Sequence, residues 1–366
     1  MELNNGKNKS KDNNNINKIK SKLILKKIFN LLTKNKLLWI IKINKETQNK
    51  LNININNYKE YSEIYTKIII EIIPAKNKYG KFINFLNKEE IPFYHIYFND
   101  GTKEPNRNTR KNNRIYKKDN IIKIKIIIDH QIKSFYKLFN DCKCIESFRF
   151  IKISRTNIYN SSHMFSCCSL LKQIDISKFN TVNILDMSYM FYKCESLLNL
   201  NLNNFNTSNV TKMNHMFFKC QSLSELNLDN FNTNNVTDMS YMFCECKSLI
   251  KLNVSKFNTE KVKSMYYMFS DYSKLKELDI SNFNTINTKN VDNMFTYCRA
   301  LEKLILGDFN MNNMDNININ DMFYGCTNEL KKKMQDKFKN IWKETIKNNN
   351  KNSKFFLYFF IFFYIY

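Results

Sequence analysis

The chain has 366 residues, enough for two or three domains, and carries a formal net charge of +25. Lysines and arginines minus acids give 28 − 12 = +16 for residues 1–130, 21 − 19 = +2 for residues 131–330 and 9 − 2 = +7 for residues 331–366. The nearly neutral centre argues against nucleic-acid binding there, and the first 18 residues lack the apolar stretch of a secretory signal.

The N-terminal part predicts a disordered Asn/Lys-rich tail over residues 1–20 and a basic α+β capping region over residues 21–130. Residues 22–51, with ILKKIFNLLTKNKLLWII at their centre, predict two short helices. They resemble an F-box that lacks the usual Leu-Pro opening, and this resemblance implies a substrate adaptor of a ubiquitin ligase. A plain helical cap and a basic helix lying on a membrane surface are the alternatives.

Three apolar runs follow, over residues 65–73, 91–98 and 121–128, and each predicts a strand. We expect them to form a small sheet that covers the open edge of the segment that comes next, because exposed sheet edges invite aggregation.

Residues 131–328 are built on a repeat of 26 residues. One landmark is a phenylalanine at constant spacing: Phe179, Phe205, Phe231, Phe257, Phe283 and Phe309. The second is a Met-Phe pair, which runs from the degenerate Leu138-Phe139 to Met322-Phe323, where the last copy arrives two residues late. Chance does not explain this register.

Each unit contains two apolar rhythms, illustrated by FNTSNVTKMNHMFFKCQSLSELNLDN over residues 205–230. The apolar residues from Val210 to Cys220 follow i, i+3, i+6, i+7 and i+10, which predicts a short helical segment. LxxLxL from Leu223 to Leu228 predicts a strand. A strand plus a short helical segment in each unit predicts an α/β leucine-rich-repeat solenoid, and we expect Asn at the left-handed turn positions because Gly is scarce.

The runs NVTKMNHMFFKCQSLSELNLDNFNT and NVTDMSYMFCECKSLIKLNVSKFNT resemble the BspA-like leucine-rich repeats of bacterial surface proteins and protist proteins. The resemblance covers about half of the chain. It implies a non-catalytic role in adhesion or protein interaction, and it makes a membrane-attached or surface adhesin the alternative to a ubiquitin-ligase adaptor.

The ten cysteines and four histidines do not predict a metal site or a cofactor. Seven cysteines share one column of the repeat, which favours a buried row of reduced thiols: Cys142, Cys168, Cys194, Cys220, Cys246, Cys298 and Cys326. His163 and His215 share the column before Met-Phe with several tyrosines but are two units apart, too far to share one ion, so this column predicts an aromatic stripe. Common catalytic motifs are missing, so we expect no enzyme.

The alternation of LxxLxL predicts a polar concave strand face as the surface that binds a protein partner. Its candidate residues are Asp175, Asn201, Asn203, Glu225, Asn227, Asp229, Asn253, Glu277 and Asp279. The acids on this face also argue against nucleic acid.

The C-terminal part predicts a capping helix over residues 329–347 and an Asn/Lys linker with an aromatic tail over residues 348–366. The apolar end, residues 355–366, is too short to span a bilayer but offers a membrane-interface tail. We expect an elongated monomer, inside the cell by preference because a secretory signal is missing, with membrane or surface attachment as the alternative.

Overall fold

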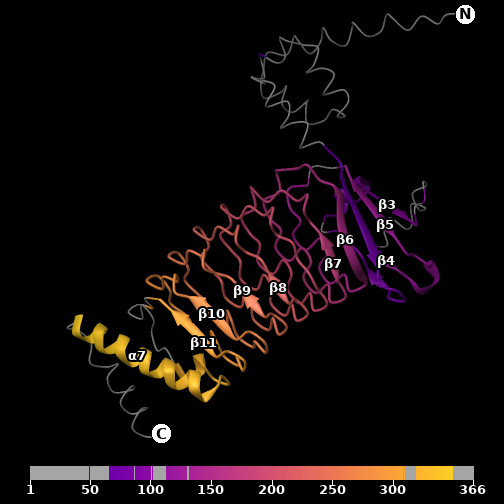
Figure 1. Ribbon diagram of the computed structural model, residues 1–366. Coiled ribbons are helices and arrows are strands. Elements are labelled where there is room, and N and C mark those ends of the chain that lie inside the picture. The colour runs from indigo at the N-terminus through magenta and orange to yellow at the C-terminus, as the bar shows by residue number, and fades with distance from the viewer. Residues whose placement is uncertain are drawn as a thin grey trace, which may run out of the picture.

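The computed structural model describes residues 49, 66–85, 87–99, 101, 113–129, 132–307, 309 and 319–348. The predictions for residues 1–20 and 355–366, and those for residues 22–51 apart from residue 49, therefore lie outside the described residues. Figure 1 shows a sheet at one end, a long stack of similar coils in the middle and helix α7 at the other end.

The N-terminal end is a five-stranded sheet of order β3-β5-β1-β6-β7. Its strands are β1 (Ile68–Pro74), β3 (Tyr94–Phe98), β5 (Ile124–Ile128), β6 (Ile145–Lys152) and β7 (Gln173–Asp175). Strand β1 pairs antiparallel with β5 and β6, whereas β6 pairs parallel with β7. Each of the three apolar runs contains a strand, and β1 occupies the edge of β6 that would otherwise be open.

Smaller elements surround this sheet. Strand β2 (Gly80–Lys81) pairs with β4 (Arg114–Ile115), and the two 3₁₀ turns are η1 (Lys88–Phe93) and η2 (Lys117–Asp119).

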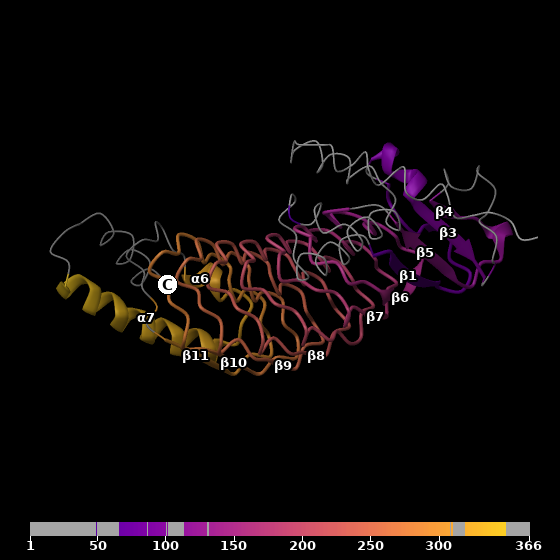
Figure 2. The same cartoon turned by 90° about the horizontal axis from the view of Figure 1, so that it is seen from above.

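The middle of the chain is a stack of coils in strict 26-residue register. Parallel bridges join Ser134 to Asn160 and continue at the same spacing to Asn290, so neighbouring units lie side by side in the same orientation. The LxxLxL segments form two isolated parallel pairs, β8 (Glu225–Leu226) with β9 (Lys251–Leu252) and β10 (Glu277–Ile280) with β11 (Lys303–Leu306). Figure 2 shows these strands following one side of the stack.

The predicted α/β leucine-rich-repeat class is wrong. After β6, residues 153–307 contain only turns, bends, bridges and strands of two to four residues, whereas the prediction placed a helical segment in every unit. A helix would bond each N–H to the carbonyl four residues earlier. Here the N–H of Phe165 donates to the carbonyl of Met190 in the next unit, 2.9 Å away, and the N–H of Met164 closes a three-residue turn onto Ser161.

Left-handed residues explain why the helix cannot form. Two residues around each pair from Leu138-Phe139 to Met294-Phe295 have positive φ, for example His163 at 56° and Cys167 at 60°. Such residues interrupt a right-handed helix. Within the stack, histidine, tyrosine, lysine, cysteine and acidic residues hold nearly all of these positions, and Asn293 is the exception among residues 132–307. The prediction that Asn fills the left-handed positions of the repeat is therefore wrong.

Asparagine and aspartate instead close the corners of each unit. Their side-chain oxygen accepts the N–H two residues later, as in an Asx turn. Over one 26-residue stretch this happens at Asp186, Asn201 and Asn206, whose side-chain oxygens accept N–H groups at 2.9–3.0 Å. Other asparagines bridge units: the Asn230 amide donates to the carbonyl of Phe205 at 2.6 Å. The Asx turns within units and the amide hydrogen bonds between units explain the abundance of Asn in the repeats.

The core consists of stacked identical side chains. The phenylalanine rings of the Met-Phe pairs, from Phe139 to Phe323, stack at centroid distances of 5.4–5.9 Å with interplanar angles of 5–9°. Leucines of LxxLxL are buried beside them, for example Leu226 and Leu228. Each fully buried side chain of this size contributes about 1.5–3 kcal/mol, which a single unit could not gain alone.

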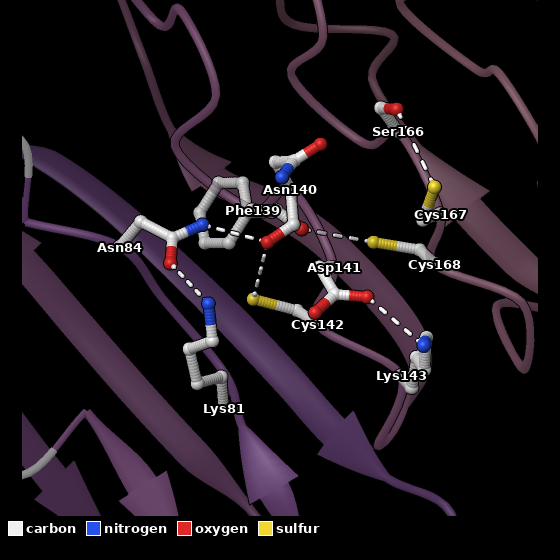
Figure 3. Close-up of polar contacts among 10 residues, drawn as sticks. All are labelled: Lys81, Asn84, Phe139, Asn140, Asp141, Cys142, Lys143, Ser166, Cys167 and Cys168. Carbon is white, nitrogen blue, oxygen red and sulfur yellow. Dashed lines mark hydrogen bonds and ion pairs between the residues drawn. The ribbon is translucent and has the colours of Figure 1, made fainter.

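Asn84 caps the first of the Met-Phe turns, the one that contains Phe139. Its backbone N–H donates to the carbonyl of Leu138 at 2.7 Å, and its side-chain amide donates to the carbonyl of Asn140 at 2.7 Å. In later units the equivalent carbonyls, such as those of Met164 and Ser166, accept N–H groups from the preceding unit. Asn84 therefore provides the N–H donors that a preceding unit provides elsewhere in the stack. Figure 3 shows it facing the turn that contains Asn140.

The C-terminal end carries α6 (Ile319–Met322) and α7 (Asn328–Asn348). In α7, Leu330, Met334 and Phe338 are buried, and the ring of Phe338 contacts Phe309 and Phe323. No helix among the described residues is long and apolar enough to cross a membrane.

Candidate interaction surfaces

The strand face is formed by the outward residues at positions 173, 175 and 177 and their equivalents every 26 residues. Burial confirms the alternation: Leu226 and Leu228 are buried, while Glu225, Asn227 and Asp229 between and beside them are exposed. All nine candidate residues are exposed, and the 26-residue register places them in three parallel columns along the stack.

The middle column of the strand face serves the backbone. Its members accept the N–H of the residue two positions later at 2.8–3.0 Å: Asp175, Asn201, Asn227, Asn253 and Asp279. Hydrogen bonds from Ser177 and Ser281 also lower the pKa of Asp175 and Asp279. Each of these five side-chain oxygens accepts a hydrogen bond in the turn that ends its strand. The turn alone therefore accounts for Asn or Asp at these positions, without a role in partner binding.

The other four candidates differ in how much they are occupied. Glu277 forms an ion pair with Lys303 across neighbouring units at 3.4 Å. Asp229 accepts a hydrogen bond from the Asn253 amide at 2.9 Å. Asn203 contributes its N–H to the Asx turn of Asn201. Within the described part of the chain, the carboxylate of Glu225 has no hydrogen bond or ion pair, which leaves it available to a partner.

Two exposed aliphatic side chains beside the strand face were not predicted from the sequence. Leu198 is 47% exposed and Ile250 is 54% exposed, and both occupy the position before the first outward column, two units apart. Most other units carry lysine, serine or glutamate there. The sequence shows that Leu198 and Ile250 are aliphatic where equivalent positions are polar, and this difference could have identified them as contact residues.

An aromatic ladder lies on the turn side of the stack. Its rings, at left-handed residues, stack in order at centroid distances of 4.3–5.1 Å: His163, Tyr189, His215, Tyr241 and Tyr267. All five are half-buried, in keeping with the predicted stripe. Because the ring faces contact one another, only ring edges and polar atoms are presented to solvent.

The ladder histidines have depressed basicity. Burial lowers the pKa of His215 to about 4, and it lowers the pKa of His163 as well. The Nδ1 atom of His215 is buried without a hydrogen-bond partner. Within the described residues, no cluster of His, Cys, Asp and Glu could hold a metal ion.

The cysteine column is buried beside the phenylalanine stack. All ten cysteines are free, and Cys167 alone among them is half-exposed. From Cys168 onward the column thiols donate to the phenylalanine carbonyl of the preceding unit, as Cys220 does to Phe191 at 3.3 Å, whereas Cys142 donates to the carbonyl of Asn140 in its own turn. Burial raises the pKa of the Cys220 thiol to about 12. A buried thiol whose pKa is raised in this way stays protonated and acts as a hydrogen-bond donor in the core.

Comparison with known proteins identifies one family. Neither the curated proteins nor the solved structures contain a match to the chain. A family model described as "Mycoplasma protein of unknown function, DUF285" matches residues 133–227 and residues 222–338. Together the matches cover residues 133–338, more than half of the 366 residues. The chain therefore belongs to the DUF285 family.

Proposed function

We propose that the chain is a non-enzymatic repeat scaffold that binds a protein partner through its strand face. The observation that carries the proposal is the regular exposed array of that face, with Glu225 free at its centre and Leu198 and Ile250 beside it. A charged side chain can orient a bound partner through an ion pair, and the aliphatic side chains beside it provide apolar area that the partner buries.

Two further features support this proposal. The Asx turns fix the backbone of the face in advance, so a partner loses little free energy in ordering it. The likeness of the repeats to BspA-like proteins implies an adhesion or interaction role. Broad faces of stacked repeats are also the surfaces that repeat proteins commonly use for binding.

The test uses the charge reversal Glu225→Lys in the full chain. Partners are purified by affinity from the native cells with the wild-type protein, with Glu225→Lys and with Glu260→Lys. Glu260 is exposed in the loop after Thr259, outside the strand face, and its reversal changes the net charge equally. We expect Glu225→Lys to weaken a partner's affinity by about tenfold or more, since a central charge contributes roughly 1–2 kcal/mol.

The same purified partner decides the outcome. Retained binding by Glu260→Lys together with lost binding by Glu225→Lys supports the strand face. Unchanged affinity for Glu225→Lys, measured by titration with that partner, contradicts it.

We also propose that the protein works inside the cell, in a reducing compartment. Ten free cysteines, with thiols of the column donating to backbone carbonyls, support this location. Alkylation under denaturing conditions as soon as the native cells are lysed, followed by mass measurement, should find ten free thiols. A disulfide that involves any column cysteine in the native protein would contradict the proposal.

A further inference from the structure

The five-stranded N-terminal sheet has one buried side and one exposed side. Its inner side is made of apolar residues such as Ile70, Ile126 and Phe148, all at most 1% exposed. Its outer side contains one row set by strand register: Tyr97, Lys125, Glu71, Arg149 and Asp175. Asp175 belongs to the middle column of the strand face, so the two surfaces are continuous.

The centre of the outer side is positively charged around one carboxylate. The side chain of Glu71 is only 11% exposed, and its oxygens lie 2.6 Å from Arg149 Nε and 3.1 Å from Lys123 Nζ. Burial alone would raise the pKa of Glu71, but the hydrogen bonds and charges of Arg149 and Lys123 outweigh it and lower the pKa. The carboxylate is therefore ionised and holds both cations in place.

Glu71 does not neutralise its surroundings. Lys125 is its register neighbour in β5, and it is exposed without an ion pair among the described residues. Lys152 is exposed at the end of β6. Counting Lys123, Lys125, Arg149 and Lys152 against Glu71 and Asp175 leaves 4 − 2 = +2 on this surface.

Exposed isoleucines flank the charges. Ile73 follows Glu71 by two residues in β1 and is 42% exposed, and Ile151 follows Arg149 by two residues in β6 and is 36% exposed. Positions two apart in a strand share one face of the sheet. The outer side thus offers cations at its centre and aliphatic side chains at both ends.

We propose that the outer side of this sheet binds an acidic, partly apolar segment of a protein partner. This inference rests on the proposed function, because the surface extends the strand face. Carboxylates of the segment meet Lys125 and the Arg149 guanidinium, and its apolar side chains cover Ile73 and Ile151. The proposal favours a peptide over a lipid bilayer, because membrane attraction of about 1 kcal/mol per cation needs a denser basic cluster than this surface offers.

The test measures binding of a labelled peptide to the full chain by fluorescence anisotropy. The probe has about 12 residues, which span roughly 40 Å when extended, and contains aspartate, glutamate, glycine and two leucines. A comparison peptide carries lysine at every acidic position. We expect the acidic peptide to bind, its affinity to fall with salt, and Lys125→Glu to weaken it by about tenfold or more.

Lys289→Glu is the matched control. Lys289 is exposed in the loop that bonds to Lys263, away from the sheet, and its reversal changes the net charge by the same amount. Equal losses for both variants would show attraction by net charge alone and would overturn the proposal. So would a comparison peptide that binds as well as the acidic one, or tighter Lys125-dependent binding to phosphatidylserine vesicles than to the acidic peptide.

This experiment separates the two proposals. Glu225→Lys should leave peptide binding intact, because Glu225 lies in a unit that does not pair with the N-terminal sheet. Failure of the acidic peptide to bind would therefore end the inference about the sheet, while the Glu225→Lys test on the native partner would still stand.

Discussion

At the scale of single residues, the stack carries a repeated backbone cost. A left-handed conformation costs a non-glycine residue roughly 1–2 kcal/mol, and the Met-Phe turns place two such residues in each of the regular units. Two interactions offset this cost at His215: its N–H donates to the carbonyl of Ser240 at 2.9 Å, and its ring stacks between Tyr189 and Tyr241. Both partners belong to neighbouring units, so the conformation depends on stacking.

Tyr272 is the residue that departs from the cysteine column, and it predicts a stability change. Its ring is fully buried, but its hydroxyl has no hydrogen-bond partner among the described residues. A buried hydroxyl without a partner costs about 1–3 kcal/mol. Tyr272→Phe removes the hydroxyl and keeps the ring, so we expect the free energy of unfolding to rise by about 1 kcal/mol in chemical denaturation.

Tyr324→Phe provides the control for that measurement. Tyr324 is 56% exposed, so loss of its hydroxyl should change stability by no more than about 0.5 kcal/mol. If Tyr272→Phe were less stable than the wild type, the hydroxyl of Tyr272 would have to be satisfied in solution, and the expectation would be wrong.

At the scale of elements, the sequence predicted which residues are buried better than how the backbone runs. The LxxLxL alternation predicted burial correctly, because successive side chains of a strand point to opposite faces and the sequence alone assigns each residue to a face. The Met-Phe segment has helical spacing, yet alternate N–H groups bond to carbonyls 25 residues later, as the N–H of Phe165 does to Met190. Periodicity along the chain does not contain that information, because the competing partner lies in the next unit.

The candidate residues show the same division. Exposure of Asn227 followed from the pattern, but its Asx turn with Asp229 did not, although Asn and Asp side chains commonly bond the backbone N–H two residues later. The outer side of the N-terminal sheet was missed for another reason. Arg149 and Lys125 become neighbours of Glu71 only through the pairing of β1 with both β5 and β6, which the sequence did not specify.

At the scale of the whole molecule, the stack is a chain of nearest-neighbour contacts in which each unit depends on the next. The N-terminal sheet closes one end and α7 closes the other (Figures 1 and 2). Asn84 bonds to the first turn of the stack at the N-terminal end. The phenylalanine stack and the aromatic ladder both cross several units without interruption. A perturbation inside either one therefore acts on the coupling between units, and the aromatic ladder contains histidines that burial keeps from being protonated in mild acid.

The ladder predicts loss of stability in acid. The folded pKa of His215, about 4, lies below the ordinary value of 6.5, so the unfolded chain binds the proton more readily. The contribution of His215 is fully present above about pH 6.5, falls as the pH decreases toward 4 and stays constant below that. Near His215, Asp238 favours protonation while His163 opposes it. Each pKa unit corresponds to about 1.4 kcal/mol, and because the ring is only half-buried we expect a loss of roughly 1–3 kcal/mol.

His215→Tyr isolates this contribution, because tyrosine is the usual residue of the column and does not titrate in acid. Denaturation of the wild type and the variant at about pH 7, about pH 5.5 and about pH 4.5 gives two pH profiles across the range in which the unfolded histidine takes up its proton. The carboxylates contribute equally to both profiles, so the difference between them reports His215. We expect the variant to lose less stability on acidification, and His163→Tyr added to it to flatten the profile further, since burial also lowers the pKa of His163. Identical profiles for the wild type and His215→Tyr would contradict the prediction. They would mean that the folded ladder binds the proton on His215 as readily as the unfolded chain does.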